Sequence, residues 1–281
     1  MEIIIAIAIL GGLGLIFGLV LAAASKVFYV ETDPRLDALN ETLPGANCGG
    51  CGYAGCGGYA EAVLNGEAPI GACASGGNEC AQAMAAIMGV EVSETKRKVA
   101  FVRCSGYHRV DSEGKEQGSK KKAQYEGFKD CRAATTVGGS GPIACKFGCL
   151  GFGSCVKACK YDAISIVDGV AKVDREKCVG CMACVRACPK NIIAPVDYDK
   201  QVFIPCASRA KGAITVRGCS QGCIGCGMCV KICEEGAITL DRGLARIDPD
   251  KCVDCGLCAT VCPRKLIISL ASEPAATPVA K

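Results

Sequence analysis

Residues 145–159 read CKFGCLGFGSCVKAC, with four cysteines in the spacing C-x3-C-x5-C-x3-C. The ligand run of a bacterial iron–sulfur loop is C-x2-C-x2-C-x3-C, so this stretch departs from that run in its first half. A second copy follows, because residues 145–193 match residues 219–267 without a gap. The second copy begins CSQGCIGCGMCVKIC and contains the regular run, so the motif at 145–159 is duplicated and not decayed.

One substitution explains the irregular spacing of the first copy. Phe152 stands where the second copy has Cys226, the middle ligand of its regular run. Cys145 lies four residues before Cys149 and is available as a replacement ligand. The second copy keeps both Cys219 and Cys226, so one of them is surplus to a four-ligand cluster there. We therefore expect an intact site with Cys145 in the role of the missing cysteine, and a three-ligand or empty site is the alternative.

The cysteines of this chain suit metal ligation better than disulfides. There are 25 cysteines in 281 residues, and many lie in triplets two residues apart. Cysteines so close in sequence do not form a sensible set of disulfides, whereas they allow several thiolates to converge on one metal centre.

The chain has no tryptophan, so its small modules depend on their cofactors for part of their folding free energy. The net charge of +4 is modest and no G-x-x-x-x-G-K-[ST] loop occurs, so nucleic acid is not an expected partner.

A separate cysteine motif lies nearer the N-terminus, where residues 47–63 read NCGGCGYAGCGGYAEAV. Its glycines allow the backbone to wrap closely around an inorganic core. A helix is expected after the third cysteine, ending near Gly66 and Pro69. Zinc also accepts four thiolates, but its usual paired C-x2-C knuckles are not seen here. We interpret the motif as the binding site of one cluster, the N-terminal quartet, formed by Cys48, Cys51, Cys56 and Cys73.

Residues 3–25 are apolar and uncharged, and are flanked by Glu2 and Lys26. A helix of this length crosses a hydrocarbon core of roughly 30 Å. A signal peptide is the alternative, but no basic residue precedes the run and the run exceeds the usual ~7–15 residues of a signal core. Lys26 and Arg35 follow the run, so we expect a single-pass anchor in the cell's inner (plasma) membrane, with the bulk of the chain on the cytoplasmic side.

The region between the N-terminal quartet and the repeat is more polar. Residues 81–92 predict a short amphipathic helix, residues 94–104 a charged approach to a strand, and residues 108–127 a solvated loop. The basic runs at 96–98 and 120–122 are interpreted as solvated surface, with a docking patch for an acidic carrier protein as the alternative. No function is assigned to His108.

Each copy of the repeat resembles a bacterial two-cluster ferredoxin module. In that pattern the fourth cysteine of each run ligates the other run's cluster. The resemblance implies quartet 1A (Cys145, Cys149, Cys155 and Cys188), quartet 1B (Cys159, Cys178, Cys181 and Cys184), quartet 2A (Cys223, Cys226, Cys229 and Cys262) and quartet 2B (Cys233, Cys252, Cys255 and Cys258).

Between the runs, short hairpins are predicted with turns at Asp168-Gly169 and Arg242-Gly243. The expected fold class is α+β: a single N-terminal transmembrane helix, a small N-terminal Fe–S domain and two tandem two-cluster ferredoxin-like modules. The expected boundaries are an anchor at 1–26, a [4Fe-4S] domain at 27–90, a charged linker or strand region at 91–140, modules at 141–200 and 201–270, and a disordered tail at 271–281.

The remaining cysteines have no place in the five quartets. AFVRCS at 100–105 is similar to VFIPCAS at 202–208, so Cys104 and Cys206 are candidates for equivalent positions. They are either buried free thiols or ligands of further clusters. The cysteines left open in this way are Cys80, Cys104, Cys131, Cys206 and Cys219.

The whole chain resembles the B subunit of the Rnf complex, with its anchor, its NCGGCGYAGC segment and its ferredoxin modules. That resemblance implies a membrane-bound ferredoxin:NAD oxidoreductase complex that moves Na⁺ or H⁺. This subunit would take electrons from soluble reduced ferredoxin and relay them through about five [4Fe-4S] clusters to the other membrane and cytoplasmic subunits. It would have no catalytic site apart from its clusters. A membrane-anchored polyferredoxin of another oxidoreductase, or a corrinoid iron–sulfur methyl-transfer protein, are the alternatives.

Overall fold

The computed structural model describes the backbone of residues 2–27, 33–92, 96–106, 108–110 and 116–270. It describes their side chains as well, except those of residues 2–4, 6–9, 27, 108–110, 116 and 117. The tail expected at 271–281 lies outside the described residues.

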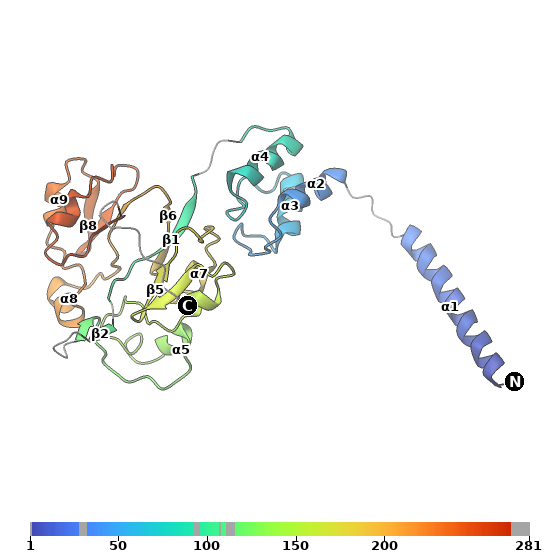
Figure 1. Cartoon of the computed structure of the whole chain (residues 1–281), viewed down its shortest axis with the longest axis horizontal. Helices are drawn as coiled ribbons and strands as arrows, with labels where there is room; N and C mark the ends of the chain where they lie inside the picture. Colours follow the sequence, from blue (N-terminus) through green and yellow to red (C-terminus); the bar gives the residue numbers. More distant parts are fainter. Residues whose placement is uncertain (1, 28–32, 93–95, 107, 111–115, 271–281) are drawn as a thin grey trace.

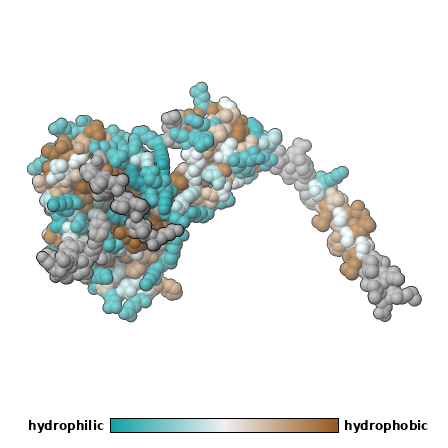
Figure 2. Space-filling view, viewed as in Figure 1, coloured by the Kyte–Doolittle hydropathy of each residue, from teal (hydrophilic) through white to brown (hydrophobic). Residues whose placement is uncertain are grey.

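Helix α1 (Glu2–Val27) lies apart from the other described elements (Figure 1). Its described part carries apolar side chains on the surface, among them Leu10, Phe17 and Leu21 (Figure 2). Within the described part of the chain, no helix combines the length and apolar character that crossing a membrane requires. The transmembrane span expected at 3–25 therefore stays a prediction.

Three helices form the N-terminal domain, α2 (Pro34–Thr42), α3 (Cys56–Leu64) and α4 (Gly77–Met88). Helix α2 packs against both others, and their shared core is centred on Leu39, Tyr59 and Met84, which are fully buried. The helices predicted after Cys56 and at 81–92 are confirmed as α3 and α4, although α4 begins earlier, at Gly77.

Module 1 contains the hairpin of β4 (Ile164–Val167) and β5 (Val170–Val173) and a second antiparallel pair. In that pair β1 (Lys98–Val102) lies against β6 (Ile193–Asp197). The short helices α6 (Ser154–Lys157) and α7 (Ala183–Ala187) each carry one ligand candidate. The strand expected near residue 100 is thus present, and its pairing places it in module 1, because Val99 and Ala100 are buried in that module's core.

Module 2 repeats this arrangement with β8 (Ile238–Asp241) and β9 (Leu244–Ile247) as its hairpin and β7 (Val202–Phe203) paired with β10 (Ile268–Ser269). Its helices are α8 (Gly212–Gly218), α9 (Met228–Ile232) and α10 (Leu257–Thr260). Both hairpin turns are where the sequence predicts them. Asp168, Gly169, Arg242 and Gly243 all have positive φ, as two-residue turns that match the strand twist require.

Module 1 has an insertion between β1 and its first cysteine run. The insertion contains the antiparallel strands β2 (His108–Val110) and β3 (Glu116–Gly118) and the helix α5 (Cys131–Thr135). The prediction of a solvated loop at 108–127 is therefore wrong for β2 and β3. After β3, Ser119 is buried because it forms a bridge to Cys219 of module 2, while Lys121 bridges to Ile143.

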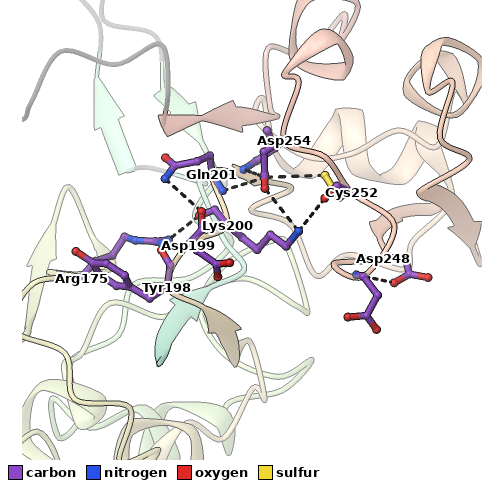
Figure 3. A network of polar contacts seen from close by, with 10 residues as sticks. Arg175, Tyr198, Asp199, Lys200, Gln201, Asp248, Cys252 and Asp254 are labelled. Carbon is purple, nitrogen blue, oxygen red and sulfur yellow. Dashed lines mark hydrogen bonds and ion pairs between the residues drawn. The ribbon is translucent and has the colours of Figure 1, made fainter. Parts of the chain in front are cut away.

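The segment that joins the modules, residues 198–202, is held by both of them (Figure 3). From module 1, Arg175 donates hydrogen bonds to the carbonyls of Tyr198 and Lys200. From module 2, the Asp254 carboxylate accepts from the amides of Gln201 and Val202 at 3.0 and 2.9 Å. The Lys200 ammonium donates to the Cys252 carbonyl at 2.7 Å and lies 3.7 Å from the Asp254 carboxylate. The linker is thus fixed to the surface of both modules.

Candidate iron–sulfur sites

The N-terminal quartet surrounds one narrow hollow, which all four of its cysteines line. The loop that carries three of them closes through Asn47, whose side-chain oxygen accepts from the Cys56 amide at 2.8 Å. Gly55 has φ of +119°, and a Cβ there would lie 2.7 Å from the same oxygen, so this position requires glycine. The structure therefore brings together the four cysteines that the sequence grouped here.

Electrostatics in this hollow show how close the thiols are. Burial raises the pKa of Cys73, the Gly76 amide lowers it, and the thiols of Cys51, Cys56 and Cys48 add to the rise. Burial also acts against ionisation of Cys48, but hydrogen bonds from the Ser75 hydroxyl and the Gly50 amide bring its pKa below the ordinary value. Thiolates this close together repel one another, and this repulsion raises their pKa values. The positive charge of bound iron would offset the repulsion and favour the thiolate forms.

Two of the four module quartets surround hollows of their own. All four cysteines of quartet 1B line one hollow and all four of quartet 2A line another. In quartet 2B, burial raises the pKa of Cys258 to about 11, and the thiols of Cys252 and Cys255 contribute to the rise. The thiol of Cys233, the fourth member, adds to the raised pKa of Cys252. The structure thus brings together the members of quartets 1B, 2A and 2B, while their role as ligands stays a prediction.

Backbone amides point at several of these sulfur atoms. The Ala100 amide donates to Cys178 Sγ at 3.4 Å, and the Leu266 amide donates to Cys262 Sγ at the same distance. Hydrogen bonds of this kind stabilise thiolate ligands and tune a cluster's reduction potential. Within each first run, Gly151 and Gly225 have positive φ, and a Cβ on either would lie about 2.4–2.5 Å from a carbonyl oxygen of the hairpin turn. The loops therefore wrap closely against the hairpins.

Quartet 1A differs from the expectation. Burial raises the pKa of Cys155 to about 12, and the neighbouring thiols that contribute include Cys149, Cys131 and Cys188. The Cys131 thiol of α5 also contributes to the raised pKa of Cys149, so it lies near these two members of quartet 1A, while Cys184 of quartet 1B contributes to the pKa of Cys155 as well. Cys145 instead lines a separate cavity together with cysteines from outside the five quartets. Sequence reasoning left the role of Cys131 open, between a buried free thiol and a ligand of a further cluster.

The quartets are neighbours along the molecule. The N-terminal quartet lies against quartet 1B, because a Cβ on Gly50 would be 2.9 Å from the Cys181 carbonyl oxygen. Tyr161 donates to the Ser75 hydroxyl at 3.0 Å, and that hydroxyl lies 3.5 Å from Cys48 Sγ. Quartets 1B and 1A adjoin through Cys184 and Cys155, and quartets 2A and 2B adjoin through Cys229 and Cys258.

The donor sets meet the requirements of iron–sulfur clusters. Among the described residues, no three or more His, Cys, Asp or Glu side chains are placed to hold one metal ion together. In a four-iron cluster each thiolate binds a different iron, so its ligands need not converge on a point. Four thiols around a hollow, amides directed at sulfur and glycines that allow close wrapping are all present at the N-terminal quartet, as a cluster site requires.

Three family models match the chain at these sites. Residues 43–75 match the family described as "Putative Fe-S cluster", residues 171–194 match "4Fe-4S binding domain", and residues 222–266 match "4Fe-4S dicluster domain". They cover the N-terminal quartet, part of module 1 and nearly all of the cysteine runs of module 2. Iron–sulfur domains are therefore present in all three parts.

Several relatives match across all of these parts. The chain is 45% identical over 251 residues to the B subunit of the Na(+)-translocating ferredoxin:NAD(+) oxidoreductase complex of Acetobacterium woodii, covering 89% of this chain and 73% of that one. It is 40% identical over 262 residues to the B subunit of the ion-translocating oxidoreductase complex of Methanosarcina acetivorans, covering 93% and 96%. It is 42% identical over 249 residues to the B subunit of the proton-translocating ferredoxin:NAD(+) oxidoreductase complex of Clostridium ljungdahlii, covering 88% and 84%. The chain therefore belongs to the family of B subunits of the Rnf-type ion-translocating oxidoreductase complexes.

Proposed function

We propose that this protein is the electron-relay subunit of an Rnf-type complex. It accepts electrons from reduced ferredoxin and passes them through [4Fe-4S] clusters to partner subunits of a ferredoxin:NAD oxidoreductase that moves Na⁺ or H⁺. The observation that carries the proposal is the succession of adjacent cysteine quartets from the N-terminal domain into module 1, with a further adjacent pair in module 2. Relatives over most of the chain are named as subunits of such complexes.

The clusters, when bound, supply one-electron carriers. The chain's own contribution is to hold them and set their surroundings. Most members of the quartets are buried or half-buried, which protects a bound cluster from solvent, and amides such as that of Ala100 stabilise the thiolates.

Cys226 and Cys255 are exposed, and both belong to module 2. We propose that ferredoxin donates electrons at module 2 and that they leave through the N-terminal domain, which lies between α1 and the modules (Figure 1).

Electron uptake is testable on the full-length protein after anaerobic reconstitution of its clusters. Mixing with reduced ferredoxin should bleach the visible absorbance of the clusters and oxidise the ferredoxin. Dithionite serves as the control that the clusters are intact and reducible. If dithionite bleaches the clusters and reduced ferredoxin does not, the proposed role as ferredoxin acceptor is refuted.

We further propose that α1 anchors the protein in the cell membrane, with the modules on the cytoplasmic side. The support is the uncharged sequence of residues 3–25 and the basic residues Lys26 and Arg35 that follow it. Protease added to right-side-out cells should leave everything after Lys26 intact, and should degrade it after the cells are opened. Cleavage from outside, or full release of the chain by washing membranes with high salt, would contradict this topology.

A further inference from the structure

A cavity of about 220 Å³ lies between the two modules. It is larger than the hollows of about 10–20 Å³ at the N-terminal quartet and at quartets 1B and 2A, so its side chains leave room for a group of some size. Four cysteines line it, and they come from two equivalent places in each module: the segment after the first strand, and the start of the first run. These cysteines are Cys104, Cys145, Cys206 and Cys219.

Amides are directed at two of these sulfur atoms in an equivalent way. The Cys149 amide donates to Cys104 Sγ at 3.3 Å, and in module 2 the Cys223 amide donates to Cys206 Sγ at 3.5 Å. The Ser208 amide also donates to Cys206 Sγ, at 3.5 Å. Amide donors at sulfur were described above for Cys178 and Cys262 of the ferredoxin-type quartets. The cavity cysteines share this feature.

All four thiols line the same cavity. A Cβ on Gly222 would lie 3.8 Å from Cys219 Sγ. Small residues keep the surroundings open, because a Cβ on Gly106 would approach Cys219 Sγ to 3.3 Å. The four thiols therefore surround one and the same cavity.

Hydrogen bonds hold Cys131 beside the first cysteine run of module 1. The Cys131 amide donates to the Ser154 hydroxyl at 2.8 Å, and that hydroxyl donates to the Asp130 carboxylate at 2.7 Å. These bonds fix Cys131 beside the helix that carries Cys155. Phe152 packs with Cys131 in the same apolar cluster and against Tyr125, with ring centroids 5.2 Å apart. The insertion thus covers the position where the regular middle ligand would lie and brings a cysteine of its own.

We propose that the four cavity cysteines hold a further [4Fe-4S] cluster, the bridging cluster, and that Cys131 completes quartet 1A in place of Cys145. The 25 cysteines then form six quartets and leave Cys80 alone. Two of the residues that would hold the bridging cluster, Cys104 and Cys206, accept hydrogen bonds from the amides of Cys149 in quartet 1A and Cys223 in quartet 2A. Given the proposed relay function, on which this assignment rests, the bridging cluster would carry electrons from module 2 to module 1.

The test is the iron content of the full-length protein after anaerobic reconstitution, measured with the EPR spectrum of the reduced form. Six four-iron clusters give about 24 iron atoms per chain, and five give about 20. Cys206→Ala and Cys219→Ala should each lose about four iron atoms and one EPR component. Cys80→Ser is the control, because it keeps a hydrogen-bonding group beside Cys73, and it should keep the full iron content. Retention of full iron by both cavity variants, or zinc in the cavity in place of iron, would overturn the inference.

A second pair of variants separates the two assignments of quartet 1A. Cys131→Ala should lose about four iron atoms, and adding Phe152→Cys should restore them by rebuilding the regular run. Adding Phe152→Cys to Cys145→Ala should restore nothing, because Cys145 serves the bridging cluster. The reverse pattern, with rescue of Cys145→Ala and full iron in Cys131→Ala, would return Cys145 to quartet 1A. Retention of the other clusters shows in each case that the variant has folded.

These outcomes are independent of the test of the relay function. If the cavity variants keep their iron but reduced ferredoxin still bleaches the clusters, the bridging cluster is refuted and the relay function stands. If the iron losses occur as expected but ferredoxin reduces no cluster, the relay function is refuted and the ligand assignment stands.

Discussion

Asp254 should decide how firmly the linker between the modules is held. Its carboxylate accepts two backbone hydrogen bonds, from the Gln201 and Val202 amides, and lies near the Lys200 ammonium. Hydrogen bonds to a charged group contribute about 1.5–3 kcal/mol each, and this carboxylate is about one-fifth exposed, at 19%. Two such bonds come to about 3–6 kcal/mol, and because water can reach this partly exposed carboxylate we expect Asp254→Ala to make release of the linker easier by a smaller amount, about 2–4 kcal/mol.

Asp254→Asn is the matched control. Its side-chain oxygen can still accept from both amides, so it loses mainly the charge and the ion pair with Lys200. An ion pair of this kind contributes about 0–1 kcal/mol. The asparagine variant should therefore release the linker at most about five-fold more readily than the unchanged protein.

Trypsin measures this release, because it cleaves after Lys200 only when the linker leaves the surface. When opening is fast relative to cleavage, the cleavage rate follows the population of the open state. Cleavage after Lys200 should then rise by about 30-fold to 700-fold in Asp254→Ala, relative to cleavage after the exposed Lys129 in the same sample. Equal rates in the alanine variant and the unchanged protein would refute the role given to Asp254. So would equal rates in the alanine and asparagine variants.

Three further predictions concern the modules and the N-terminal domain. Tyr59→Phe should destabilise the N-terminal domain by about 1–3 kcal/mol in denaturant titrations, because the buried hydroxyl donates to the Pro69 carbonyl at 2.9 Å and accepts from the Ala72 amide at 3.2 Å. Gly151→Ala should lower the iron content while Gly58→Ala leaves it unchanged, because only the first Cβ meets a backbone oxygen, at 2.4 Å, and only Gly151 has positive φ. Anaerobic removal of iron with a chelator should abolish the circular dichroism of folded modules, since ligation contributes to their folding free energy; an unchanged spectrum would show that the apoprotein folds by itself.

The repeat made much of the modules predictable. A two-residue turn needs positive φ at both positions, so Asp168-Gly169 between two alternating apolar stretches was enough to place a hairpin. The grouping of cysteines at quartets 1B, 2A and 2B followed from spacing and the ferredoxin resemblance. In the N-terminal domain, the glycines around Cys51 and the helix after Cys56 were visible in the same way.

The insertion in module 1 was not predictable by these means. Its position over Phe152 depends on tertiary contacts, among them the ring contact with Tyr125 and the hydrogen bond from the Cys131 amide to Ser154. A polar segment with basic runs predicts a solvated loop, yet the structure places the buried Ser119 directly after β3. Long-range pairing of this kind leaves no local period in the sequence, and so Cys131 had no visible partner.

The cavity between the modules has walls made of equivalent residues, Cys104 with Cys206 and Cys145 with Cys219. Two halves that each offer the same surface to the other form an isologous contact, the arrangement of a twofold-symmetric homodimer. The single chain therefore has the internal layout of a twofold dimer whose two halves are covalently connected by the linker at residues 198–202. Substitution at one of these four positions alters a wall shared by both halves, whereas a position inside one half, such as Phe152, can differ without its counterpart.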